Sequence, residues 1–298
     1  MFRQATKQQS RLRLTLDGPA GSGKTYTALR FAHALIAQFG GRIALVDTER
    51  GSASKYAGDA PDGIVWAFDV LELTNFSPER YTEAILEAGR SGYSVLILDS
   101  LSHAWEGVGG ALELKQRAGE AWSAWRHVTP IHNRMVDAIL QAPCHVITTI
   151  RSRMEYVQEA DERGRVSIRK VGLAPIQRPG MEYEFDLVCD LDWSHILTVS
   201  KSSCSAVADL KIERPGPEFM RPVIAWLAAG ATKGTGGTEG AKDAALPRAT
   251  ETPGVTLEDL LAQFDAELIL AANDGQLPTD DATVARLATL LGWSAAHE

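Results

Sequence analysis

The sequence has few cysteines and no long hydrophobic run, and both absences limit what the chain can be. Its 298 residues include three cysteines, Cys144, Cys189 and Cys204, which are isolated and widely spaced. This spacing excludes a disulfide framework and a cysteine-based zinc site, and it favours a reducing compartment such as the cytoplasm. No stretch of 18 apolar residues is present, so we expect no transmembrane helix and no membrane partner. The first ten residues carry charge without an apolar core, so we expect no secretory signal peptide.

An excess of positive charge is also missing. The formal net charge is −8, which argues against a simple basic nucleic-acid binder. Residues 230–298 hold four basic and eleven acidic side chains, a net charge of −7, which leaves −1 for residues 1–229. Within that nearly neutral part, residues 151–178 hold seven basic and four acidic side chains, a net charge of +3. The pattern indicates one basic stretch followed by an acidic C-terminal region, although ordinary scatter of surface charge would also produce it.

One octapeptide near the N-terminus carries the strongest functional signal. Residues 18–25 read G-P-A-G-S-G-K-T and fit the pattern G-x-x-x-x-G-K-[ST] at every fixed position. Glycine permits the tight bend that turns several backbone N–H groups toward one anion. In this motif Lys24 reaches the β- and γ-phosphates, and the hydroxyl of Thr25 ligates Mg²⁺.

The flanks of the octapeptide agree with this interpretation. Residues 13–17 alternate like a strand and residues 26–38 have a helical pattern, so the loop opens a helix whose dipole favours anions. The sequence therefore predicts an ATP and Mg²⁺ site. Its nucleotide-binding residues are Gly18, Pro19, Ala20, Gly21, Ser22, Gly23, Lys24, Thr25 and Tyr26.

The remaining pattern is that of an α/β protein. Short apolar runs that predict strands lie at residues 43–47, 64–70, 93–99, 145–150, 183–190 and 195–200. Predicted helices lie at residues 78–89, 111–141 and 219–229, the first with Ser77 as N-cap and Pro78 at its first position. Within the second, Trp122 and Trp125 are three residues apart, a spacing that favours core packing over base stacking. The basic stretch resembles a hairpin of residues 154–157 and 166–170 with R-G-R at its tip.

Composition divides the chain into three parts. We expect an ATPase core at residues 11–229, a flexible linker rich in Gly and Thr at 230–254, and a small acidic helical region at 255–298. The last part contains helical patterns at 256–271 and 281–291. The expected fold class is thus α/β: a P-loop NTPase core with a central, mostly parallel sheet flanked by helices, plus a small C-terminal helical appendage.

Hydrolysis requires an acid that orients Mg²⁺ and a base that activates water, and two carboxylates stand where these are needed. Asp99 ends an apolar strand and is the candidate magnesium acid (Walker B). Glu49 lies just past the end of the strand at residues 43–47, at the sheet edge where ligands bind in open α/β folds. Glu49 is the candidate base.

Several segments resemble RecA-type recombinases. The segment I-A-L-V-D-T-E-R-G-S-A-S-K-Y at residues 43–56 is similar to their strand that carries the catalytic glutamate, with a tyrosine that stacks on adenine seven positions later. The resemblance therefore implies a RecA-like core, with Glu49 as base and Tyr56 on the nucleotide. V-L-I-L-D-S at residues 95–100 resembles their magnesium-binding strand.

Two later segments extend this resemblance. V-I-T-T-I-R at residues 146–151 resembles the strand of the γ-phosphate sensor, which implies that role for Thr149, although RecA has glutamine there. L-T-V-S-K-S at residues 197–202 is similar to a late strand whose lysines reach the nucleotide of a neighbouring subunit. Lys201 is thus a candidate catalytic residue acting in trans, and a homo-oligomer is implied.

A narrower resemblance, over roughly residues 11–227, is to RecA-like ATP-binding proteins of phages and prophages, some of which anneal single strands. It implies that the basic stretch binds single-stranded DNA, with Tyr156 available for stacking and phosphate contacts from Arg151, Arg153, Arg163, Arg165, Arg169 and Lys170. The acidic C-terminal region would then compete with DNA for this surface or dock a partner such as a single-stranded-DNA-binding protein.

Three other functions are compatible with a phosphate-binding loop. A helicase loader or KaiC-like regulatory ATPase would act mainly through protein partners and be indifferent to DNA. A small-molecule kinase has less support, because we identify no lid-like arginine cluster near a substrate pocket. A non-catalytic nucleotide sensor is a further alternative if Thr149 does not sense the γ-phosphate.

Overall fold

The computed structural model describes residues 10–59, 61–119, 121–160 and 166–229, with only the course of the backbone between residues 156 and 171. The predicted linker, both predicted C-terminal helices and the hairpin tip lie outside the described residues. Two compact units are distinguished, and residues 1–157 and 168–237 form the first. All that follows concerns this first unit, apart from the bounds and pairing of β5 and β6, which run on beyond it.

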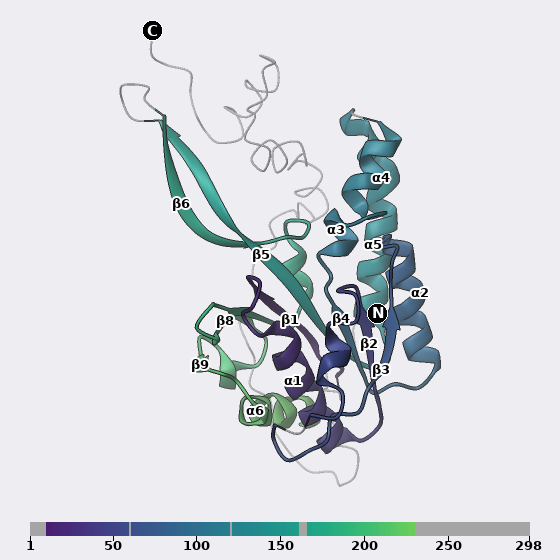
Figure 1. The fold of residues 1–298 in the computed structure, drawn as a ribbon, viewed down its shortest axis with the longest axis vertical. Coiled ribbons are helices and arrows are strands. Elements are labelled where there is room, and N and C mark those ends of the chain that lie inside the picture. Colours follow the sequence, from purple (N-terminus) through teal and green to yellow (C-terminus); the bar gives the residue numbers. More distant parts are fainter. Residues whose placement is uncertain (1–9, 60, 120, 161–165, 230–298) are drawn as a thin grey trace, which may run out of the picture. The chain divides into compact units, whose positions relative to one another are not determined.

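A nine-stranded sheet forms the centre of the fold (Figure 1). Its main order is β3-β2-β4-β5-β1-β7-β8-β9, and β6 pairs with β5. The strands are β1 Arg13–Gly18, β2 Ile43–Asp47, β3 Asp69–Glu72, β4 Val95–Asp99, β5 His145–Ala160, β6 Val166–Pro175, β7 Leu187–Leu191, β8 Ile196–Ser202 and β9 Lys211–Glu213. The pairs from β3 to β7 along this order are parallel, whereas β7–β8 and β8–β9 are antiparallel. The predicted central, mostly parallel sheet is therefore confirmed.

Helices cover the sheet on both faces. The helices are α1 Lys24–Phe39, α2 Pro78–Arg90, α3 His103–Glu106, α4 Ala111–Ala118, α5 Trp125–Gln141 and α6 Pro217–Ala228. One buried cluster joins the sheet to α1 and α6 and includes Ile97, whereas a second joins it to α2 and α5 and includes Leu96 and Leu98. Neighbouring residues of β4 thus enter opposite clusters, as the alternation of side chains along a strand requires. This is why the central strands are continuously apolar.

The ends of α2 follow from its sequence. Ser77 is the N-cap and its hydroxyl accepts a hydrogen bond from the backbone N–H of Arg80, while Pro78 occupies the first turn. The predicted boundaries of this helix are confirmed within one residue.

Three predicted elements were wrong in their bounds. The strand expected at residues 64–70 is instead the edge strand β3, because Trp66 exchanges backbone hydrogen bonds with Gly58 and Asp59 in a loop. The long helix expected at residues 111–141 is divided, since Gly119 has a φ of +128° and a short 3₁₀ helix precedes α5. The strand expected at residues 183–190 begins only at Leu187, after a 3₁₀ helix at Met181–Glu184.

The two tryptophans of the divided helix behave as core residues. Trp125 is buried and stacks on Trp105 of α3 with ring centroids 5.5 Å apart, and Trp122 lies 6.2 Å from Trp125. The expectation of core packing is confirmed for Trp125.

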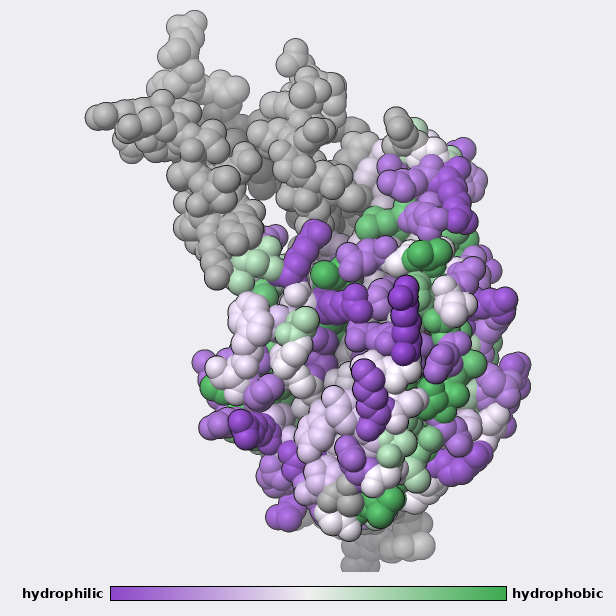
Figure 2. Space-filling view, viewed as in Figure 1, coloured by the Kyte–Doolittle hydropathy of each residue, from purple (hydrophilic) through white to green (hydrophobic). Residues whose placement is uncertain are grey.

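In the part of the chain that the structure describes, no helix combines the length and hydropathy that crossing a bilayer requires. Hydrophilic side chains dominate the face seen in Figure 2, and hydrophobic ones form separate groups. Among the exposed hydrophobic residues, Val70 and Leu71 lie on the edge strand β3.

Candidate active site

The phosphate-binding loop connects β1 to α1 as expected. Gly21 and Gly23 have φ values of +80° and +91°, in the left-handed region that glycine adopts without steric cost. A Cβ atom at Gly18 would lie 2.4 Å from the carbonyl oxygen of Leu191, so this position accepts only glycine. The loop therefore holds its shape through its own glycines and through contact with the neighbouring strand β7.

Lys24 lies over the loop that precedes it. Its Nζ donates hydrogen bonds to the carbonyl oxygens of Gly18 at 2.8 Å and Pro19 at 2.9 Å. Burial lowers the pKa of this ammonium, while the nearby carboxylates Asp99 and Glu49 act in the opposite direction. The ammonium of Lys24 thus lies over the loop, and the carboxylates of Asp99 and Glu49 act on its charge.

Asp99 is bound by two threonines. Thr25 Oγ1 donates to Asp99 Oδ2 at 2.7 Å, and the hydroxyl of Thr149 donates to the other carboxylate oxygen. Both Asp99 and Thr149 are buried. Burial raises the pKa of Asp99, and the two threonine hydrogen bonds oppose that shift. The predicted magnesium acid and the predicted magnesium hydroxyl are therefore in direct contact.

Glu49 follows β2 in a turn that Asp47 organises. The carboxylate of Asp47 accepts hydrogen bonds from the backbone N–H groups of Glu49 and Ala53, and Arg50 and Gly51 both have positive φ. The carboxylate of Glu49 forms an ion pair with Arg151, at 2.8 Å from Nη2 and 3.0 Å from Nε. The sheet order brings the two residues together, because β2 and β5 flank β4.

These residues fit a nucleotide and Mg²⁺. A hydroxyl and a carboxylate converge at Thr25 and Asp99, and a lysine closes a glycine-built loop at a helix N-terminus. Magnesium bound with a nucleotide takes one or two protein ligands and completes its shell with phosphate oxygens and water. The described residues contain no cluster of three or more His, Cys, Asp or Glu side chains suited to a metal ion.

Comparison with known proteins identifies the family. Residues 10–210 match a protein family described as an AAA domain. The chain belongs to this AAA-domain family. A KaiC-like protein from the hyperthermophilic archaeon Pyrococcus horikoshii OT3 is similar in structure, with a TM-score of 0.42 and 14% identity over 66% of this chain and 82% of that one. No curated protein matches the chain. The predicted P-loop ATPase core is confirmed at the level of the family.

The predicted adenine-stacking residue lies in an aromatic cluster of this AAA domain. Tyr56, in the 3₁₀ helix Ala53–Tyr56, meets Tyr26 edge to face at 5.8 Å, and Tyr26 lies 5.1 Å from Trp66. Tyr26 is on α1, two residues after Lys24, so the cluster lies beside the phosphate-binding loop. A role for Tyr56 and Tyr26 in nucleotide binding stays a prediction.

Two other predicted catalytic residues already have partners within the chain. Thr149 is buried against Asp99, so the observed contact is with the magnesium acid. Lys201 on β8 donates to the carbonyl oxygens of Glu182 at 3.2 Å and Tyr183 at 2.6 Å. The roles of Thr149 as a sensor and of Lys201 in trans stay predictions.

The six residues predicted to bind DNA are placed unequally. Arg151 lies at the active site on Glu49, and Arg153 is exposed two residues further along β5. Arg163 and Arg165 lie outside the described residues. Arg169 and Lys170 are on β6, and their side chains are not described. The hairpin pairing of β5 with β6 is confirmed, but β5 is one continuous strand from the sheet into the hairpin.

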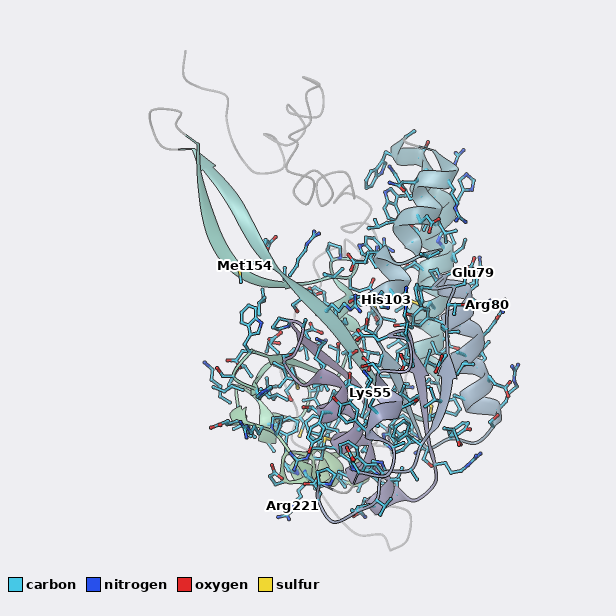
Figure 3. The ribbon with its side chains drawn as sticks, in the orientation of Figure 1. Lys55, Glu79, Arg80, His103, Met154 and Arg221 are labelled. Carbon is cyan, nitrogen blue, oxygen red and sulfur yellow. The ribbon has the colours of Figure 1, made fainter. Side chains whose placement is uncertain are left out.

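Two histidines near the loop were missed by sequence reasoning. His195 Nδ1 lies 3.1 Å from the carbonyl oxygen of Ser22, and His195 has a φ of +61° at the turn from β7 to β8. His103, at the start of α3 (Figure 3), lies 2.6 Å from the hydroxyl of Thr48 through its Nδ1. The sequence predicts strands at residues 183–190 and 195–200, but the position of His195 against the loop depends on the pairing of β1 with β7.

A pocket of the AAA domain lies apart from this site. It has a volume of about 420 Å³ and is lined by α1, α6 and residues 62–66, including Arg221. Figure 3 shows Arg221 at the lower edge of the view, well below His103. None of the predicted site residues lines the pocket, so it is not the candidate active site.

Proposed function

We propose that this AAA-domain chain hydrolyses ATP and binds single-stranded DNA, and that it promotes annealing or strand pairing in phage-type recombination. The contact between Thr25 and Asp99 beside the phosphate-binding loop carries the proposal for ATP. The basic residues that follow Arg151 along β5 and β6 support the proposal for DNA.

Each residue of the site has a role in the proposed reaction. Lys24 and the loop N–H groups bind the β- and γ-phosphates, and Thr25 and Asp99 hold Mg²⁺. Bound Mg²⁺ and nucleotide supply a γ-phosphoryl group whose negative charge is partly neutralised. Glu49 accepts a proton from the attacking water, while the bond to the bridging oxygen of ADP breaks and inorganic phosphate forms.

The proposal includes assembly of several copies. ATP would bind where two subunits meet, with Lys201 reaching the nucleotide of the neighbour. To do so, its ammonium would leave the carbonyl oxygens of Glu182 and Tyr183, which are exposed partners that water can replace. Native mass with and without ATP tests this part of the proposal.

The rate of ATP hydrolysis with and without single-stranded DNA tests the function itself. We expect stimulation by DNA, whereas a helicase loader or KaiC-like regulatory ATPase would be indifferent to it. Glu49→Gln should retain ATP binding and lose hydrolysis, since the amide accepts no proton from water. Full turnover in that variant would refute the assignment of the base, and normal ATP binding by Lys24→Ala would refute the loop assignment.

A further inference from the structure

The ion pair between Arg151 and Glu49 occupies the proposed catalytic base. Both guanidinium contacts, from Nε and Nη2, go to the same oxygen, Oε1 of Glu49. The two side chains are 39% and 28% exposed, so neither is locked into the core. The guanidinium thus uses both lone pairs of Oε1, so the attacking water cannot hydrogen-bond to that oxygen while the ion pair is formed.

The backbone of Arg151 is fixed by hydrogen bonds of its own, separate from the ion pair of its side chain. Its N–H donates to Ser102 Oγ at 2.8 Å, and its carbonyl oxygen accepts from the N–H of Ile176 at 2.7 Å. In the parallel pairing of β1 with β5, Arg151 is the register partner of Gly18, the first residue of the phosphate-binding loop. A fixed backbone at this register and a half-exposed guanidinium allow the side chain to exchange partners near the loop.

Electrostatics supports a short distance between these groups and the phosphate site. Glu49 raises and Arg151 lowers the pKa of Lys24, although burial of the ammonium is the larger cause. Lys24 is the residue that contacts the β- and γ-phosphates in this motif. The register of Arg151 beside Gly18 likewise puts Arg151 at the end of β5 that adjoins the phosphate-binding loop.

We propose that Arg151 is a positioning residue that exchanges Glu49 for the γ-phosphate when ATP binds. Guanidinium binds phosphate and carboxylate with the same forked geometry, and the more highly charged phosphate competes for it. The exchange frees Glu49 to accept a proton from water only when a triphosphate is present. ADP lacks the competing group and leaves the ion pair intact. This inference rests on the proposed ATPase function and reassigns Arg151 from DNA to nucleotide.

Equilibrium binding of ADP and of a non-hydrolysable ATP analogue tests the exchange without any turnover. Arg151→Gln should weaken binding of the analogue by about 10-fold or more and binding of ADP by less than about 3-fold. Arg80→Gln is the matched control, because it breaks a surface ion pair with Glu83 on α2 at the same 2.8 Å. An equal loss of affinity for ADP and for the analogue would overturn the proposal. A loss of DNA affinity with an unchanged ratio of the two nucleotide affinities would also overturn it.

Glu49→Gln provides a second and sharper readout. Removing the carboxylate releases Arg151, so this variant should bind the analogue several-fold more tightly than the original chain, with ADP unaffected. The gain should vanish when Arg151→Gln is added, which makes the two effects non-additive. Additive effects would overturn the proposal. Two measurements on the unaltered chain report separately on the proposed function: binding of the analogue, and hydrolysis of ATP with and without DNA.

Discussion

At the scale of single residues, the active site depends on how Asp99 is held. Its two carboxylate oxygens accept hydrogen bonds from Thr25, in the phosphate-binding loop motif, and from Thr149, whose strand resembles that of the γ-phosphate sensor. Thr149 is buried beneath the carboxylate and orients it, since a buried hydroxyl donor fixes the acceptor that it satisfies.

Thr149→Val should therefore raise the Mg²⁺ requirement of ATP hydrolysis. The substitution keeps the shape and removes the donor, which we expect to increase the half-saturating Mg²⁺ concentration by about 3- to 30-fold. A titration of Mg²⁺ at fixed ATP measures the change. Thr148→Val is the control, because the hydroxyl of Thr148 is buried with no hydrogen-bond partner. An unchanged Mg²⁺ requirement in Thr149→Val would contradict this role for Thr149.

The buried carboxyl group of Asp17 makes the stability of the protein depend on pH. Burial raises its pKa from 3.8 to about 7, aided by Asp190 and Glu182 and opposed by Thr15 and Lys24. Because the folded state holds this proton more tightly than the unfolded state, Asp17 makes the free energy of unfolding fall as pH rises from about 4 to about 7.

Asp17→Asn should remove that contribution. Compared with the unaltered chain, the variant should gain about 3–4 kcal/mol of stability at pH 8 relative to pH 4, on a scale of roughly 1.4 kcal/mol per tenfold change in proton affinity. Urea unfolding across this range measures the difference. His132 and His145, whose pKa values burial lowers to about 4, change stability in the opposite direction equally in both proteins. A constant difference between the two proteins would refute the assignment.

The sequence offers candidate site residues where the signal is local. The phosphate-binding loop is contiguous, and Asp99 and Glu49 each stand at or just past the end of an apolar strand. The ion pair between Glu49 and Arg151 joins residues 102 positions apart, and the contact exists only because β4 separates their strands in the sheet. No pattern in the sequence specifies that strand order.

At the scale of elements, Arg13 joins β1 to the end of α5. Its guanidinium donates to the carbonyl oxygens of Leu12, Leu140, Ala142 and Cys144, at distances from 2.6 to 3.0 Å. The last carbonyl groups of a helix have no intrahelical donor, so this buried side chain satisfies that of Leu140 in α5 and that of the C-cap Ala142. The alternation of polar and apolar residues at 13–17 predicted the strand β1. The hydrogen bonds of Arg13 that connect β1 to α5 could not be predicted from that pattern.

Arg13→Lys should destabilise the core despite keeping the charge. A lysine cannot reproduce the forked set of donors, so at least two buried carbonyl groups lose a partner, at a cost of about 2–4 kcal/mol. Chemical denaturation measures this cost. Arg90→Lys, in an exposed ion pair with Glu87, is the control and should change stability by less than about 0.5 kcal/mol. Equal effects of the two substitutions would show that Arg13 does not hold the two elements together.

The element bounds that sequence patterns missed share a physical cause. Helical periodicity continues across residues 111–141, but Gly119 and the buried stack of Trp105 on Trp125 favour a break. Residues 64–68 are apolar like a strand, yet Trp66 is buried against α1, where it stacks on His33. In both places, burial of a tryptophan overrode the local pattern.

At the scale of the whole molecule, charge is separated along the chain. Residues 230–298 carry a net charge of −7, and the basic stretch at residues 151–178 carries +3. The described contacts of the candidate active-site residues lie between Gly18 and Lys201, and α6 completes the core cluster before residue 229. Nucleotide binding and any effect of the acidic region on DNA binding should therefore be separable.

A chain ending at residue 229 should bind ATP as the full chain does and bind single-stranded DNA more tightly. Removing seven net negative charges reduces repulsion of phosphate, and we expect a gain of about 3- to 30-fold at 50 mM salt that shrinks toward unity at 300 mM. Anisotropy of a labelled oligonucleotide at both salt concentrations measures the gain. A variant of the 298-residue chain with Glu258, Asp259, Asp265 and Glu267 changed to amides should show part of the same gain. It removes four negative charges and leaves the segment in place. If the truncated chain binds DNA more tightly and the neutralised chain does not, the effect comes from the segment itself and competition by charge is refuted.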